Sequence, residues 1–235
     1  MPNDQVRNGT PPRDQAVGDG AAARKIAREL VADIISGRLP PGTQLREVSL
    51  TEKYGTGRYT IRSALRELEI AGLAESRRFA GYRVKALTRD DVKDIFAVRL
   101  LIETEAARRA MDRPEAWPQI RKRIDELEQL EALHIESNMA GDDRFNAASL
   151  EADLAVHLAI VEASASPRLV AAYSPLLSEL RLCLSWIALT NTSFRPGQHA
   201  ELLMAIQSGD AVHVASAFRI HISDGLKDAL AQIQK

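Results

Sequence analysis

The spacing of apolar and polar residues divides the chain into a first third of short elements and a remainder of long ones. Between residues 21 and 35 apolar side chains recur every three or four positions, and Gly37 follows them, which predicts a helix closed by a glycine cap. A turn, two more short helical patterns and a pair of β-like segments come next. These predicted elements are helices at about 48–54 and 58–71 and a β-hairpin formed by 73–77 and 82–85.

Three helices and a hairpin in such a short stretch predict a winged helix-turn-helix over residues 21–87, with its third helix entering the major groove of DNA. Residues 1–20 are rich in proline, glycine and polar side chains, so we expect a disordered tail there.

No strand pattern is present after Thr88, and amphipathic helical stretches separated by proline or glycine continue to the end of the chain. Thr88 precedes two aspartates and is a candidate N-cap. The fold class is therefore mainly α, with an all-α antiparallel bundle over residues 88–235. The predicted helices of this bundle are 88–112, 114–139, 142–165, 167–190, 197–208 and 210–233.

Charge separates the same two parts. Residues 21–87 carry 13 basic and 7 acidic side chains, whereas residues 88–235 carry 16 basic and 22 acidic ones. A net positive first part favours a polyanionic partner. The single Cys183 excludes an internal disulfide framework, and no apolar run is long enough for a membrane span. We expect a cytoplasmic protein that does not associate with membranes.

Four side chains of the second part form a candidate metal site. Asp153 and His157 are four residues apart in an apolar-periodic run, so a helix would place both on one face. His199 and His221 belong to two later helical patterns. Three imidazoles and one carboxylate suit zinc, with nickel or manganese as alternatives.

Specific residues of the first part resemble the GntR family of bacterial regulators. The matching stretches run from the turn before the second helix to the wing. They are Leu39–Glu47, Arg58, Ile61–Arg62, Ala64–Leu65, Leu68–Glu69, Gly72–Leu73 and Gly81–Val84. Where many relatives have a hydroxyl residue and a proline, this chain has Gly57 and Thr60.

The helical part is similar to the FadR-type (FCD) effector domain of that family. The metal-binding branch has an Asp-x-x-x-His motif and two later histidines, which Asp153, His157, His199 and His221 match. The resemblance implies a transcription regulator, not an enzyme, that binds an operator as a homodimer. Because two-fold symmetry in the protein is mirrored in the DNA, we expect the operator to be an inverted repeat.

The arginines of the third helix are the leading candidates for DNA contact. Arg58 and Arg62 lie on one stripe opposite the apolar face, and a bidentate arginine–guanine contact is the commonest specific contact in the major groove. The alternative is a solvated surface stripe. Other predicted DNA contacts, to bases or phosphates, are Arg46, Tyr59, Thr60, Arg77 and Arg78.

The resemblance also places an arginine of the first effector-domain helix, Arg99, in the ligand pocket. An arginine beside a metal ion suits a small carboxylate effector. The alternative is a salt bridge from Arg99 to Glu103, four residues along. Arg181 and Asn191 are further candidates for effector contact.

Two other functions remain open at the level of the sequence. A site of three histidines and one aspartate could activate water in a metal-dependent hydrolase, although no general base accompanies the four residues. A regulator whose signal is the metal ion itself is the second alternative. The ion could also be a structural element or the anchor for an effector.

Overall fold

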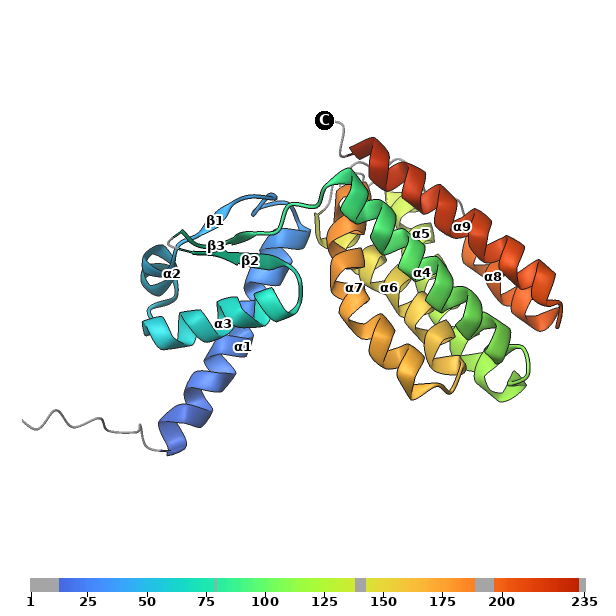
Figure 1. The fold of residues 1–235 in the computed structure, drawn as a ribbon, viewed down its shortest axis with the longest axis horizontal. Coiled ribbons are helices and arrows are strands. Elements are labelled where there is room, and N and C mark those ends of the chain that lie inside the picture. Colours follow the sequence, from blue (N-terminus) through green and yellow to red (C-terminus); the bar gives the residue numbers. More distant parts are fainter. Residues whose placement is uncertain (1–12, 79, 138–142, 189–196, 233–235) are drawn as a thin grey trace, which may run out of the picture.

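The computed structural model describes residues 13–78, 80–137, 143–188 and 197–232, and Figure 1 shows their arrangement. The N-terminal part combines helices with a small sheet along one edge, and helices alone form the C-terminal part. The elements are α1 (Arg13–Ile35), β1 (Gln44–Leu45), α2 (Glu47–Tyr54), α3 (Arg58–Ile70), β2 (Ala74–Arg77), β3 (Gly81–Val84), α4 (Arg89–Ala110), the 3₁₀ turn η1 (Pro114–Ala116), α5 (Trp117–Ser137), α6 (Asp143–Ala163), α7 (Pro167–Ala188), α8 (Gln198–Gln207) and α9 (Ala211–Gln232).

The N-terminal part is the predicted winged helix-turn-helix. Its core joins α1 to α3 through Leu30, Ile61, Leu65 and Leu68, each of which is at most 1% exposed. These residues come from the apolar stripes visible in the sequence, so burial of those stripes holds the two helices together. The turn between α2 and α3 uses Gly55 at φ 58°, a left-handed conformation that costs glycine little.

The wing is a three-stranded antiparallel sheet in the order β1-β3-β2. β2 and β3 form the predicted hairpin, with Ser76 opposite Tyr82. β1 was not predicted. It pairs with β3 through Gln44 opposite Arg83, and two residues are too few for an alternating pattern to be recognised.

The C-terminal part is the predicted helical bundle. α4 packs against α6, α7 and α9, and α5 packs against α6. Large buried side chains fill the bundle, among them Phe96, Ile160, Tyr173 and Phe218. No helix in the described part of the chain is long and apolar enough to cross a membrane.

The start of α4 confirms the predicted cap at Thr88. The Thr88 hydroxyl accepts a hydrogen bond from the Asp91 backbone N–H, and the Asp91 carboxylate accepts one from the Thr88 backbone N–H. This reciprocal arrangement is a capping box, which satisfies two backbone donors at the helix start.

The first helix differs from the expectation. α1 begins at Arg13 rather than at residue 21, so residues 13–20, expected in the disordered tail, are helical. Their sequence lacks an apolar stripe, but a helix already fixed by burial of Ala23 and Leu30 can extend at little cost, because elongation is easier than nucleation.

The two parts meet at the end of the wing. Lys85, just after β3, forms an ion pair with Glu179 of α7 at 2.8 Å between Nζ and Oε1. Arg89, at the start of α4, donates to the Leu230 carbonyl of α9 at 2.9 Å. A Cβ atom at Gly72, after α3, would lie 3.3 Å from Glu179 Cγ. α7 therefore lies against the N-terminal part.

Candidate metal centre and DNA-binding surface

Three histidines from three helices converge in the interior of the bundle. His157 comes from α6, His199 from α8 and His221 from α9, and their ring centroids lie 4.8–5.3 Å apart. One nitrogen from each ring lies within 4.8 Å of the other two. His157 and His199 are buried, and His221 is partly buried. The structure thus brings together the three histidines that the sequence predicted as ligands.

Asp153 adds an oxygen to this cluster. It lies one turn before His157 on α6, and its Oδ1 is 3.0 Å from His199 Nε2. The distance is that of an ion pair, but His199 Nε2 has no hydrogen-bond partner with acceptable angles among the described residues. The same holds for the buried Nδ1 of His221. Buried nitrogens without partners are costly unless something else satisfies them.

The spacing of the ring nitrogens fits a shared cation. His157 Nε2 and His221 Nε2 are 3.1 Å apart. Two nitrogens bound to one zinc ion at about 2.0–2.1 Å, with angles of about 90–109°, would lie ~2.9–3.4 Å apart. The donor set of three imidazoles and one carboxylate therefore suits zinc, and also nickel or manganese.

The electrostatics keep Asp153, His157 and His221 in the forms that bind metals. Burial lowers the pKa of His157 and of His221, and Arg99 lowers both further. Burial alone would raise the pKa of Asp153, but His199, His157 and Arg99 bring it well below its usual range. Neutral imidazoles beside an ionised carboxylate are the protonation states that a divalent cation requires.

A buried polar network lies behind His157, and the sequence indicated only its Arg99–Glu103 pair. Glu103 of α4 is fully buried and accepts from Arg99 Nε at 2.8 Å and from the Tyr173 hydroxyl at 2.6 Å. Its other oxygen is 2.8 Å from His157 Nδ1. Burial would raise the pKa of Glu103, but Arg99 and His157 hold it far below the usual value. A carboxylate in this place fixes the tautomer and direction of a ligand histidine.

Arg99 therefore makes the salt bridge that was the alternative interpretation of the sequence. It is also buried, and its Nη2 has no hydrogen-bond partner among the described residues. The sequence named Glu103 as a partner through its position four residues after Arg99, but nothing in the sequence indicates that Tyr173 joins them.

Arg181, another predicted effector contact, does not join this network. Arg181 of α7 binds both carboxylate oxygens of Glu151, with Nη2 2.8 Å from Oε2, so its guanidinium is engaged on the partly exposed face between α6 and α7. Asn191 lies outside the described residues.

The N-terminal part presents most of its predicted DNA contacts to solvent. Arg58 and Tyr59 are exposed at the start of α3, Tyr59 at 79%. Arg62 is exposed one turn later and forms an ion pair with Glu47 of α2. Arg46 lies at the N-cap position of α2 and donates to the Gln44 side chain, while Arg77 is 3.4 Å from Glu75 in β2 and Arg78 is exposed just beyond it.

The prediction that Thr60 contacts DNA is wrong. We expected its hydroxyl to reach DNA, but the residue is only 2% exposed. Thr60 lies four residues before Ala64 and eight before Leu68, so it belongs to the apolar stripe of α3 and faces the core. It is not among the contacts that we propose below.

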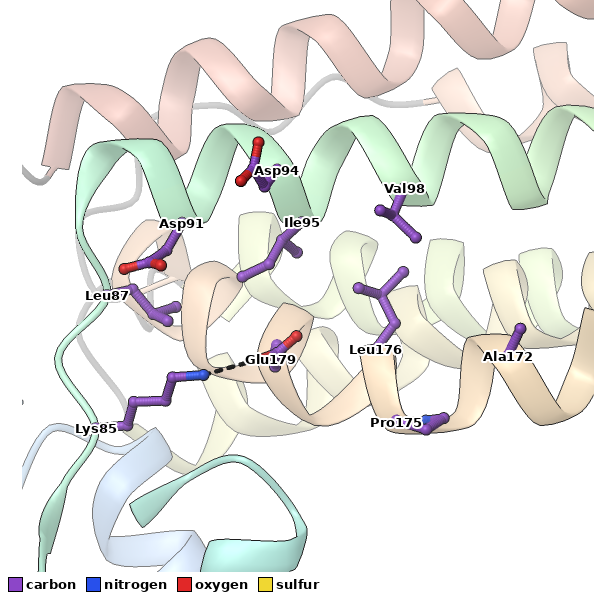
Figure 2. Close-up of a pocket in the computed structure, with 10 residues that line it drawn as sticks. All are labelled: Lys85, Leu87, Asp91, Asp94, Ile95, Val98, Ala172, Pro175, Leu176 and Glu179. Atoms are coloured by element: carbon purple, nitrogen blue, oxygen red, sulfur yellow. Dashed lines mark hydrogen bonds and ion pairs between the residues drawn. The ribbon is translucent and has the colours of Figure 1, made fainter. Parts of the chain in front are cut away.

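A separate open groove lies between α4 and α7, where the two parts of the chain meet (Figure 2). Its volume is about 360 Å³, and the Lys85–Glu179 ion pair lies at one end. Ile95, Val98 and Leu176 contribute apolar walls. The groove contains none of the clustered histidines, so it is distinct from the candidate metal centre.

A winged helix-turn-helix joined to a helical bundle defines a class of DNA-binding transcription regulators. Comparison with known proteins places the chain more narrowly. Residues 22–84 match the family described as "Bacterial regulatory proteins, gntR family", and residues 94–224 match the FCD domain. The chain belongs to the GntR family, in the FCD-containing arrangement of its FadR subfamily.

Named relatives agree with this assignment. The chain is 29% identical over 206 residues to a probable D-xylose utilization operon transcriptional repressor of Paenarthrobacter nicotinovorans, which covers 86% of this chain and 85% of that protein. It is 28% identical over 205 residues to the HTH-type transcriptional repressor GlaR of Escherichia coli K12, with 83% and 90% covered. The relatives are regulators of transcription, and so is this chain, which is not an enzyme.

A solved structure shows the same fold. A putative GntR transcriptional regulator from Rhodococcus sp. RHA1 superimposes with a TM-score of 0.69 at 19% identity, covering 91% of this chain and 98% of that one. The predicted fold class is confirmed, and the hydrolase alternative gains no support from the relatives.

Proposed function

We propose that the chain is a homodimeric regulator whose operator affinity is controlled by a small carboxylate effector at a metal-containing pocket. The observation that carries the proposal is the convergence of Asp153, His157, His199 and His221 in front of a buried arginine–glutamate network. Zinc is the ion that we expect, and nickel or manganese would suit the same donors.

The proposed pocket has a ready partner for a carboxylate. Arg99 is held by Glu103, and its Nη2 has no hydrogen-bond partner among the described residues. A buried cationic donor left unsatisfied is unfavourable, so a carboxylate that reaches it gains a charge-assisted hydrogen bond. A bound divalent ion would supply a second positive charge for the same anion. We therefore assign Arg99 to effector binding and leave Arg181 out.

Helix α7 connects this pocket to the DNA-binding module. Tyr173 binds the Glu103 carboxylate behind the cluster, and Glu179 on the same helix binds Lys85 at the end of the wing. Six residues of helix span about 9 Å. A shift of α7 caused by an effector would therefore act on the wing. Such a shift requires that the effector bind two arrangements of the protein with different affinities.

The DNA-binding side of the proposal uses Arg58, Tyr59 and Arg62 of α3 for base contacts. Arg46 before α2 and the wing residues Arg77 and Arg78 would contact phosphates. Because one module covers a half-site, two copies related by a two-fold axis would read an inverted repeat.

The test uses the purified full-length protein in three measurements. Elemental analysis should find about one divalent ion per chain. Duplexes selected from a random pool should contain an inverted repeat. Short organic acids should raise the unfolding temperature and change the affinity for the selected duplex only when the ion is present.

Each negative result identifies what fails. Absence of the ion after purification and after reconstitution would refute the proposed metal centre. An effector response that survives chelation would separate the effector from the metal. A change in operator affinity on adding the ion alone, with no acid, would instead establish a direct metal sensor.

A further inference from the structure

The first residue of α2 makes a contact that general DNA binding does not explain. Both carboxylate oxygens of Glu47 accept from Arg62 Nε of α3, at 2.8 and 2.9 Å. The glutamate side chain is 26% exposed and the arginine side chain is 65% exposed. Hydrogen bonding to Glu47 raises the pKa of Arg62, whose guanidinium is charged with or without this contact. The pair bridges the two helices of the helix-turn-helix.

A carboxylate at this position opposes DNA binding. The phosphates of the duplex repel it, and it neutralises one of the positive charges of the recognition helix. For affinity alone, a neutral residue would serve better. The helix dipole favours an acidic residue in the first turn of α2, and the contact with Arg62 Nε indicates a second contribution.

An arginine reads guanine through two parallel N–H donors, and the guanidinium must be oriented to present them. An exposed arginine has many rotamers, and fixing them on binding costs free energy. Glu47 binds the Nε group, which is nearest the helix. Because this contact restrains the guanidinium and the side chain is 65% exposed, the edge that carries the two terminal amino groups is the one left for a base.

We infer that Glu47 is a positioning residue for sequence reading, which holds the Arg62 guanidinium in the orientation that contacts a guanine. This inference rests on the proposed function, in which Arg62 contacts a base. Glu47 itself touches no DNA in this arrangement. Its contribution is to specificity, and it reduces general affinity.

The experiment compares four variants of the full-length protein. Glu47→Ala removes the carboxylate, and Glu47→Gln keeps one oxygen that can accept from Nε. Glu52→Gln removes the same charge from an exposed position of the same helix, so it is the matched control. Arg62→Ala removes the side chain that is proposed to contact the base. Each is titrated with a duplex selected by the wild-type protein and with a scrambled duplex, at several salt concentrations.

The measured quantity is the ratio of the two affinities. Glu47→Ala should lower this specificity ratio on the order of tenfold, within the range expected for one base contact. Its affinity for the scrambled duplex should be unchanged or higher. Glu47→Gln should fall between Glu47→Ala and wild type. Glu52→Gln should strengthen binding to both duplexes equally and leave the ratio unchanged.

A double variant ties the effect to Arg62. If Glu47 acts only through that arginine, Glu47→Ala combined with Arg62→Ala should have the same ratio as Arg62→Ala alone. Selection with Glu47→Ala should lose preference at the same base pair that Arg62→Ala loses.

Two results would contradict the reasoning, and they differ in whether the inference about Glu47 or the proposed function is wrong. A wild-type ratio in Glu47→Ala beside a reduced ratio in Arg62→Ala would overturn the inference and leave Arg62 as a reader. A wild-type ratio in Arg62→Ala would instead remove the base contact assumed in the proposed function. Thermal unfolding checks that each variant is folded. If Glu47→Ala does not fold, the specificity ratio of Glu47→Gln is the test, and a wild-type ratio in that variant overturns the inference.

Discussion

Replacing Glu103 by glutamine should weaken the proposed metal centre without changing any of its proposed ligands. The carboxylate is fully buried and accepts from Arg99 and Tyr173 while contacting His157 Nδ1. A carboxylate can accept all of these hydrogen bonds, so the His157 proton lies on Nδ1 and the lone pair on Nε2 faces the other histidines.

Glutamine has nearly the same shape but offers only one accepting oxygen. That oxygen would be taken by Arg99 and Tyr173, which leaves the amide N–H₂ group toward His157. Nδ1 would then have to accept, and the ring proton would move to Nε2, the atom that faces the cation. The substitution therefore favours the wrong tautomer, and we expect metal affinity to fall by about 10–100-fold or more.

Stability should fall as well, because Arg99 remains charged and buried. Removing one partner of a buried ion pair costs about 3–5 kcal/mol. For a domain of this size, each kcal/mol lowers the unfolding temperature by about 2–4 °C. We expect the helical part to unfold ~6–20 °C earlier. Glu105→Gln is the matched control, since this residue lies on the same helix but pairs with Arg108 and Arg109 at the surface.

The assays are competition with a chelator of known affinity and thermal unfolding of the metal-free protein. The control should change unfolding free energy by no more than about 0.5 kcal/mol. Wild-type metal affinity in Glu103→Gln would refute the argument about the tautomer. An unfolding temperature equal to that of the control would refute the argument about the buried charge.

Three further outcomes are expected. His199→Ala and His221→Ala should each lose most of the metal and the response to effector, whereas exposed His213→Ala should retain both, as elemental analysis and operator titration would show. The metal-free protein should lose stability as pH falls below about 6.5, because the unfolded chain takes up protons on histidines whose pKa is lowered by burial in the folded state. Thermal unfolding between about pH 7.5 and 5.5 tests whether stability falls, and an unfolding temperature that does not change with pH would contradict the prediction. Glu179→Gln should reduce, but not abolish, the effect of effector on operator affinity while metal content stays normal. A full response would show that the Glu179 contact of α7 does not transmit the effect of the effector.

Much of this architecture was predictable because it rests on local patterns. The apolar stripes of α1 and α3, the glycine at the end of α2 and the Thr88 cap are set by neighbouring residues, and the structure has them. The three histidines were found from residue type and order, although they lie on three different helices.

The parts that were missed depend on packing between helices. Tyr173 joins Glu103 across 70 residues of chain, and no spacing rule connects them. Thr60 is the opposite case. Its chemistry suggested DNA contact, but its place on the apolar stripe decided its burial, and the stripe should have been given more weight.

The Lys85–Glu179 ion pair between the two parts is weak, as the proposed regulation requires. The Lys85 and Glu179 side chains are each about 30% exposed. An ion pair with that much solvent access contributes about 0–1 kcal/mol. Allosteric coupling between two sites is typically about 1–3 kcal/mol, so this single contact could supply only part of it. The rest would have to come from the packing of α7 against the DNA-binding module and from the arrangement of the two copies on DNA. A weak contact is suited to this role, since a strong one would fix the module in a single orientation whether or not the effector is bound.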